Sequence, residues 1–593
     1  MVGAQAATAR KRTAAWYFRD QIYPRFRRLE ELLYRSELYG LALDRALYTD
    51  ESERLVWIET RKALDKAYET LESSSEYQSL LAGWRTVSQG LTGQLIDYDP
   101  KTWTSLEKTS SQSSSTRDKI SEADTLYTDA TQALSLITDP PAIPGEELLV
   151  KELAPRARRA RAWVESQRMQ FQKMAELRSQ AAKDSGSPTW AHRQLKESAE
   201  ALSSGLHRPE TLARTLKKFL SDSKKLAARA LANWSATYGK VETVEDLFRV
   251  VDTTPAFVAE AFSSEAHVSS WKRALTQAGV PDDFWDALTL DFEPRPGKHT
   301  HWYAMSTVDL RPHVLVLDAR TLNFRFPARR SSYVQPRTTL LGQISGPGLG
   351  DRERVFHEGG HALDFFFRES FLGEVSSAPY DETLSTFWER HLYDPEHLRE
   401  AAASAGRPLS EAEGTYLDAW VTFRDLIGFC DDVVMALSDL ELWETDFSPA
   451  SGPPPDFVET ARAIYLKNLT DAFPLPIAPN TPLVDRSIFS TDHIVSGDVA
   501  YFEYPLASWS ATVLWSHFSK QLRKASRKPP YRNPGLFPLL RDELLRSGFE
   551  SRFPEGITAI TGKTMRFESL RERFASLCDL RLRGGEAANQ NDP

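Results

Sequence analysis

Apolar residues recur every three or four positions along much of the N-terminal half of the chain. The pattern is clearest over Glu51–Leu71 and Glu146–Lys183, where charged residues separate the apolar ones. This spacing puts the apolar side chains on one face of a helix. A polar stretch at Thr109–Ser115 and a Pro-rich break at Asp139–Gly145 interrupt the pattern. We therefore expect residues 1–287 to form a helical scaffold with no catalytic signature of its own.

The pattern changes after this region. Short β-like runs at Leu288–Phe292, His313–Asp318 and Leu322–Phe326 are separated by turn residues, which predicts a small sheet at about 288–330. Helical spacing then resumes and continues to the end of the chain. The predicted fold class is therefore mainly α, and residues 288–593 form its second, mostly helical region.

Composition narrows the class of protein. The chain has 593 residues, of which 41% are apolar and 26% charged, and it carries 15 Trp and 30 Phe, as expected for a large aromatic-rich helical body. A net charge of -9 argues against a nucleic-acid partner. The sequence contains no apolar run of about 18 residues, so we expect no membrane-spanning helix.

The cysteines and the N-terminus bear on the compartment. Only Cys430 and Cys578 occur in the chain. So few cysteines favour a reducing compartment, and we expect both to be small buried residues. The segment Met1–Arg28 lacks the apolar stretch of a secretory signal, so we expect a cytoplasmic protein. The same segment is rich in Arg and poor in acids, which makes a mitochondrial presequence the alternative.

The segment His357-Glu358-Gly359-Gly360-His361 carries the most specific chemistry in the sequence. Two His four residues apart project from the same face of a helix, so both imidazoles can reach one metal ion. Glu358 follows the first His directly and lies where a general base can take a proton from a water molecule at the metal. This spacing predicts a site for one zinc ion in a hydrolase.

The two glycines within this segment are unusual for the middle of a helix. Each costs about 1 kcal/mol relative to Ala in such a position. That cost is tolerated where something must approach the backbone closely. We expect either the substrate or a neighbouring element to lie against Gly359 and Gly360.

A catalytic zinc needs a third protein ligand and an open position. A second helical pattern, Glu382–Tyr393, begins about 20 residues downstream, and Glu382 is the predicted ligand. Glu369 and Glu374 compete for that role. Near Glu382, Asp381 is a candidate N-cap and Glu389 a candidate carboxylate that supports a ligand from behind.

At this point the sequence resembles the family of thimet oligopeptidase and the bacterial oligoendopeptidases F, a group of zinc metallopeptidases. Three blocks carry the resemblance, over about residues 288–520: Asp291–Met305 with the following Val314–Pro327; Arg354–Asp364 with Glu382, Ser385 and Glu389; and His493–Trp509. The resemblance implies an elongated helical body with a deep central channel, a small sheet beside the metal-binding helix, and zinc at the channel floor.

The resemblance also assigns roles to individual residues. It implies that His357, His361 and Glu382 bind zinc and that Glu358 is the general base. In the third block, the residues implied to face the scissile carbonyl are His493, Tyr501 and Tyr504. A Tyr hydroxyl or a protonated imidazole can donate to the developing oxyanion. Core packing is the competing interpretation for the two tyrosines. His299 and His301 are expected to be structural or substrate-side residues.

The chain departs from the family pattern at four positions. Gly359 replaces the larger apolar residue of the usual HEFGH or HELGH segment, and Asp364 stands where many members have a further His. Leu384 replaces a Pro, and Asp498 stands where a Tyr is usual in the longer branch. These changes leave the expected ligands intact and affect the substrate pocket.

The leading hypothesis is therefore a zinc-dependent oligopeptidase that hydrolyses short peptides. We expect it to be a monomer or a weak homo-oligomer. A second hypothesis is a biosynthetic or tailoring enzyme that uses the same site on one dedicated peptide or amide, motivated by the departures near His493–Tyr504 and by the double glycine. A third is a non-catalytic peptide-binding relative, against which the intact Glu358 argues.

Overall fold

The computed structural model describes most of the chain. The described residues are 114–135, 140–151, 153–198, 205–292, 303–307, 337–341, 347–367, 378–449, 453–497, 499–525, 530–545 and 552–579, with isolated positions between 56 and 74 and at 137 and 202. They fall into two compact units, each of which is described by itself. One unit comprises residues 1–111, 282–344 and 371–373, and the other comprises 112–281, 345–370 and 374–593.

The described part of the first unit contains a short helix and a small sheet. Helix α14 (Asp282–Ala287) leads directly into strand β1 (Leu288–Asp291). Strand β3 (Arg337–Leu341) lies in the middle of the sheet, parallel to β1 and antiparallel to β2 (Tyr303–Thr307). Leu288 pairs with Thr338, and Tyr303 pairs with Leu341.

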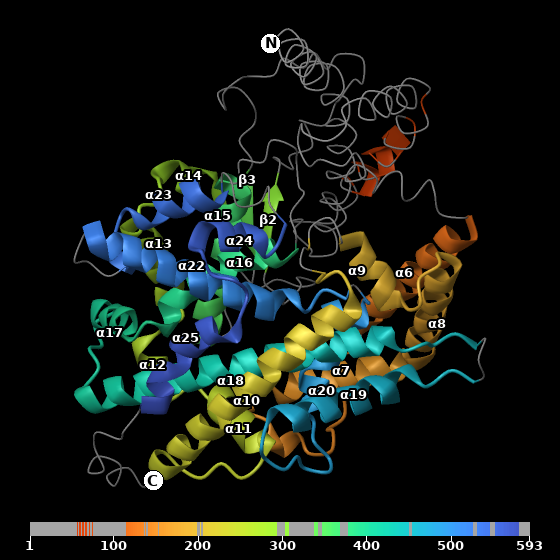
Figure 1. Ribbon diagram of the computed structural model, residues 1–593, viewed down its shortest axis with the longest axis horizontal. Helices are drawn as coiled ribbons and strands as arrows, with labels where there is room; N and C mark the ends of the chain where they lie inside the picture. The colour runs from red at the N-terminus through yellow and green to blue at the C-terminus, as the bar shows by residue number, and fades with distance from the viewer. Residues whose placement is uncertain are drawn as a thin grey trace, which may run out of the picture. The chain divides into compact units, whose positions relative to one another are not determined.

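The described residues of the second unit form helices and the loops that join them, apart from an isolated bridge between Leu202 and Phe553 (Figure 1). Its helices are α6 (Ser114–Ser135), α7 (Ala154–Ser166), α8 (Arg168–Asp184), α9 (Trp190–Glu197), α10 (Pro209–Thr237), α11 (Val244–Asp252), α12 (Ala256–Ala261), α13 (Ala266–Gln277), α15 (Gly350–Phe367), α16 (Ala378–Glu389), α17 (Pro395–Ser404), α18 (Glu411–Glu444), α19 (Phe457–Ala472), α20 (Leu483–Arg486), α21 (Asp492–Val495), α22 (Glu503–Ala525), α23 (Leu536–Leu540), α24 (Glu555–Thr561) and α25 (Phe567–Asp579).

The longest helix, α18, begins at a capping box. The Ser410 hydroxyl accepts from the Glu413 backbone N–H, and the Glu413 carboxylate accepts from the Ser410 backbone N–H at 2.8 Å. This reciprocal pair satisfies backbone donors that the first turn of a helix leaves unpaired. Beyond the cap α18 is buried along most of its length, and α10, α19, α22 and α25 pack against it (Figure 1). A helix enclosed in this way forms the core of the unit.

Helices α15, α16 and α22 pack together in the part of this unit that holds the site. The apolar residues expected to flank the His-Glu segment are buried on α15, among them Val355, Phe356 and Leu363. Thr383 on α16 and Ser510 on α22 lie buried with their hydroxyls 2.7 Å apart, so a hydrogen bond also links these two helices.

The predicted mainly α fold is confirmed, and β1 confirms the first β-like run. The expected limit of the sheet at about residue 330 is wrong, because β3 lies beyond it. The parallel pairing of β1 with β3 joins segments about 50 residues apart, which local patterns do not reveal. The other two β-like runs lie outside the described residues. The channel, the position of the sheet beside α15 and the division of the chain at residue 287 remain predictions.

Two expectations from composition can also be compared with the structure. Cys430 is buried, as expected, and burial raises the pKa of its thiol to about 12. The environment of Cys578 lies outside the described side chains. Among the described helices, none combines the length and the apolar character that crossing a bilayer requires.

Candidate metal centre

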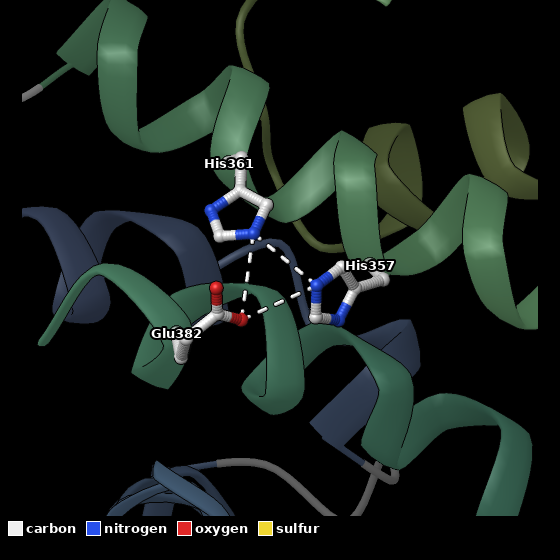
Figure 2. Close-up of side chains that lie close together, drawn as sticks. All are labelled: His357, His361 and Glu382. Atoms are coloured by element: carbon white, nitrogen blue, oxygen red, sulfur yellow. Dashed lines mark hydrogen bonds and ion pairs between the residues drawn. The ribbon is translucent and has the colours of Figure 1, made fainter. Parts of the chain in front are cut away.

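The centre lies between two helices that the sequence specifies locally. Helix α15 places His357 and His361 one turn apart on the same face, and α16 packs alongside it. Helix α16 begins at Ala378, with Pro379 in its first turn, where the missing N–H of proline costs nothing. Glu382 therefore sits on the second turn of α16 and points toward the two imidazoles (Figure 2).

Three potential ligand atoms converge there (Figure 2). The Nε2 atoms of His357 and His361 are 3.2 Å apart. Glu382 Oε2 lies 3.3 Å from the first of these nitrogens and 3.5 Å from the second. The three side chains are 14–18% exposed, so the site is enclosed but open to solvent. No other group of three His, Cys, Asp or Glu in the described residues is arranged to hold a metal.

These residues fit a zinc ion in both chemistry and spacing. Two imidazole nitrogens and one carboxylate oxygen form a ligand set that catalytic zinc sites use, with a fourth position for water. Ligands about 2.0–2.1 Å from a tetrahedral ion are about 3.3 Å apart from one another. The three separations observed, 3.2, 3.3 and 3.5 Å, agree with that spacing.

Glu389 supports His357 from behind. Its Oε1 lies 2.5 Å from His357 Nδ1, so we assign the ring proton to Nδ1, and Nε2 lies 3.3 Å from Glu382. Burial lowers the pKa of His357, but the carboxylates of Glu389 and Glu382 outweigh burial and raise it well above its usual value. Burial raises the pKa of Glu382, but His361 and His357 outweigh it and hold that pKa well below its usual range. The centre thus favours a bound cation.

A further set of charged residues adjoins Glu389, and the sequence analysis did not identify it. Arg424 on α18 forms an ion pair with Glu353 on α15, with Nη2 2.5 Å from Oε2. Tyr393 donates a short hydrogen bond to the same carboxylate. Burial raises the pKa of Glu353, but Arg424 and Tyr393 lower it overall. The sequence did contain one indication that Glu353 lies beside the metal centre: it stands four residues before His357, on the same helical face.

The double glycine is explained by helix packing. A Cβ atom on Gly360 would lie 2.5 Å from the Cα of Ser385 and 2.8 Å from the carbonyl oxygen of Leu384, both on α16. A Cβ atom on Gly359 would overlap the indole of Trp271 on α13. Real Cβ atoms do not approach other atoms so closely. Of the two alternatives that the sequence left open, a neighbouring element is the one that approaches the backbone.

The remaining candidate residues are those that the resemblance places at the scissile carbonyl: His493, Tyr501 and Tyr504. Tyr504 is on the first turn of α22, and its pKa is raised well above the usual value by burial and by the charges of Glu382 and Glu358. The Tyr501 and Tyr504 rings are 4.8 Å apart, and the exposed His493 on α21 is 6.3 Å from Tyr504, centroid to centroid. Within this group, Tyr504 is the residue whose pKa is raised by the charges of both Glu382 and Glu358.

One sequence prediction about α16 is wrong, and several candidate residues lie outside the described part of the chain. The N-cap role for Asp381 is wrong, because α16 begins three residues earlier and Asp381 lies within its first turn. The predicted helix start at Glu382 was late, although Ser377 and Pro379 in the sequence are usual signals for the start of a helix. Five candidates lie outside the described residues: His299, His301, Glu369, Glu374 and Asp498.

Comparisons with known proteins identify the fold. No protein-family model matches the sequence, and no curated protein sequence matches it. Among solved structures, the chain is similar to an M32 carboxypeptidase from Deinococcus radiodurans R1, with a TM-score of 0.59 and 14% identity over 94% of this chain and 99% of that one. A carboxypeptidase from Pyrococcus furiosus gives a TM-score of 0.59 and 15% identity, over 94% and 98% of the two chains.

A third structure, of a protein described as CHT, gives a TM-score of 0.60 and 15% identity over 95% of this chain and 98% of that one. These likenesses show that the chain shares the mainly α fold of these three structures. They do not single out the thimet oligopeptidase family that the sequence motifs resemble.

Proposed function

We propose that the chain is a zinc-dependent peptidase that hydrolyses peptide bonds in short peptides. The observation that carries the proposal is the convergence of His357 Nε2, His361 Nε2 and Glu382 Oε2 within 3.5 Å of one another. Glu358, the residue that a peptidase of this kind needs as general base, directly follows the first His on the same helix. The fold shared with carboxypeptidases supports the same class of reaction.

In this proposal His357, His361 and Glu382 hold the zinc ion. When bound, zinc supplies Lewis acidity toward the peptide carbonyl and lowers the pKa of water. The Glu358 carboxylate takes a proton from the attacking water and returns it to the leaving amine nitrogen. Glu389 holds the proton on His357 Nδ1, which keeps the ring oriented throughout.

Tyr504 and His493 are the proposed donors to the carbonyl oxygen as it gains negative charge. A tyrosine hydroxyl keeps its proton at neutral pH and is able to donate, and burial with the nearby carboxylates raises the pKa of Tyr504 further. Tyr501, 4.8 Å from Tyr504 between ring centroids, is the third proposed member of this group.

The position of the cleaved bond separates two forms of the proposal. The sequence motifs favour an oligopeptidase that cuts within a peptide, whereas the solved structures of similar fold are named carboxypeptidases. A carboxypeptidase requires a free α-carboxylate on its substrate, and an oligopeptidase does not. The tailoring-enzyme alternative loses one of its two supports, because the double glycine serves helix packing.

The test is hydrolysis of a peptide series by the zinc-loaded protein and by Glu358→Gln at the same zinc content. Peptides of graded length are prepared with free and with amidated C-termini, and products are read by mass spectrometry. Cleavage of both sets at internal bonds supports the oligopeptidase form, and removal of single residues from free C-termini alone supports the carboxypeptidase form. Equal rates for the parent and Glu358→Gln would contradict the proposal as a whole.

A further inference from the structure

The segment 494–500 connects His493 on α21 with Tyr501 and Tyr504 at the start of α22. Except for the first two residues of this segment, which end α21, its described positions lie outside regular secondary structure, although the Ala500 carbonyl accepts from the Glu503 N–H at the start of α22. All three proposed substrate-facing side chains depend on this segment for their positions. The residues that hold its backbone therefore determine where these side chains lie.

Three long-range side-chain donors bind consecutive parts of this backbone. Trp443 Nε1 on α18 donates to the carbonyl of Ile494 at 2.9 Å, and Trp190 Nε1 on α9 donates to that of Gly497 at 2.6 Å. Between them, Arg178 Nη1 on α8 donates a short hydrogen bond to the carbonyl of Ser496. The donors come from three different helices, so the segment is held from several sides.

Arg178 is the centre of this arrangement. Its side chain is 4% exposed, and its guanidinium carbon lies 5.5 Å from the Trp190 ring centroid and 5.3 Å from that of Trp443. Its Nη2 also lies 3.2 Å from Asp124 Oδ1 on α6. A guanidinium between two indole faces is fixed in orientation by cation–π attraction as well as by its hydrogen bonds.

The backbone of the segment is constrained as well as bound. Gly497 has a φ of 77°, and a Cβ atom there would overlap the Arg178 guanidinium and the Trp443 indole. Val499 has a φ of 54°, a conformation that β-branched residues rarely adopt and that persists only where the surroundings enforce it. Two residues later, the Tyr501 N–H donates to Asp439 Oδ2 at 3.1 Å. These contacts fix the direction in which α22 begins.

We propose that Arg178, with Trp190 and Trp443, positions the substrate-facing residues for peptide cleavage. The guanidinium holds the described residues of segment 494–500 in their constrained conformation, and that conformation aims Tyr504 at the metal centre. The inference rests on the proposed function, and it gives the helices before residue 287 a part in the reaction that their sequence did not reveal. Arg178 is a positioning residue, because it acts through the segment and does not touch the substrate.

The test compares Arg178→Met with Arg178→Lys in the full-length, zinc-loaded protein. Methionine keeps an unbranched chain between the two indoles but removes the donor to Ser496, whereas lysine retains a donor. We expect Arg178→Met to lower kcat by about 10- to 100-fold with little change in KM or zinc content, since a displacement of about 1 Å costs up to 10²-fold. Arg178→Lys should recover part of that loss. Backbone amide exchange should accelerate over 494–501.

The control is Arg168→Met, on the same helix α8. Arg168 pairs with Asp456 and Glu459 at the N-terminus of α19, so its loss removes long-range ion pairs without touching the segment. If Arg178→Met matches this control in kcat and in amide exchange, the proposal is wrong.

If Arg178→Met does not fold, Trp190→Phe and Trp443→Phe test the proposal in its place. Each variant keeps an aromatic ring and loses the indole N–H that donates to the segment. An unchanged kcat and unchanged exchange over 494–501 in both variants would overturn the proposal, and a fall in kcat with local acceleration of exchange would support it. A parent protein that cleaves no peptide would refute the proposed function separately. Amide exchange in Arg178→Met would then still show whether Arg178 holds the segment.

Discussion

Gly360 on α15 and Ser385 on α16 meet backbone to backbone: a Cβ atom on Gly360 would lie 2.5 Å from the Cα of Ser385. The two helices carry the three candidate ligands, His357 and His361 on one and Glu382 on the other. Their separation therefore sets the distance between the imidazoles and the carboxylate. Gly360 lowers the intrinsic stability of α15, but it allows α16 to approach closely enough for the three ligands to meet.

Gly360→Ala should separate the two helices. We expect a loss of about 1–3 kcal/mol in the free energy of unfolding, the usual cost of overpacking, together with weaker zinc binding. The measurements are denaturant unfolding and zinc affinity by competition with a chelator. The matched control is Gly428→Ala in the middle of α18, where nothing lies within 4 Å of the new Cβ atom. That change should stabilise by about 0.4–1 kcal/mol. Equal effects at the two positions would contradict this account.

Glu389 should matter for zinc binding without touching the ion. Its carboxylate accepts from His357 Nδ1, so Glu389→Leu should lower zinc affinity by about 10- to 100-fold, as loss of such partners usually does. Glu389→Gln retains an acceptor oxygen and should lose less. Chelator competition on the two variants measures this difference. Identical affinities in the parent and Glu389→Leu would show that His357 needs no support.

His391 should make the fold sensitive to acid. It is fully buried, and burial with the charge of Arg352 lowers the pKa of its ring to about 3. Below pH of about 6.5 the unfolded chain takes up a proton that the folded chain refuses, so stability falls by about 1.4 kcal/mol per pH unit until pH of about 3. His391→Phe should remove this contribution. Denaturant unfolding at pH 7, 6 and 5 gives the change in stability with pH for the parent and for His391→Phe. Equal slopes in the two proteins would show that His391 is not the group responsible.

Zinc should stabilise the folded chain. A ligand that binds only the folded state at 100 times its dissociation constant adds about 2.7 kcal/mol. We expect calorimetry to show a higher unfolding temperature with zinc and a lower one after chelation. His361→Gln should abolish this response, whereas His192→Gln, a histidine outside the centre, should retain it. A full zinc response in His361→Gln would place the ion elsewhere.

The parts of the centre that sequence could predict are those set by local geometry. A spacing of four residues on a helix brings His357 and His361 together regardless of the rest of the chain. Glu382 was predictable because the segment of about 20 residues between His361 and Glu382 is enough for a loop and a return beside the first helix. The glycines were correctly interpreted as a close approach to the backbone. Which element approaches depended on tertiary packing and was not predictable.

The parts that sequence could not predict are the contacts between distant segments. Arg178 lies more than 300 residues before Ser496, and nothing in the pattern of α8 distinguishes it from the other arginines of that region. Trp271 likewise lies far from Gly359 in the chain. The start of α16 could have been predicted from Ser377 and Pro379, whereas β3 could not, because its partners are non-local. These contacts determine the positions of residues whose chemistry the sequence had already suggested.

Anomalous diffraction at the zinc absorption edge, from crystals of the zinc-loaded protein, tests the central claim most directly. The account predicts one anomalous peak within about 2.0–2.2 Å of His357 Nε2, His361 Nε2 and a carboxylate oxygen of Glu382. A zinc peak bound elsewhere, or no peak at this position in protein that retains its zinc, would contradict it.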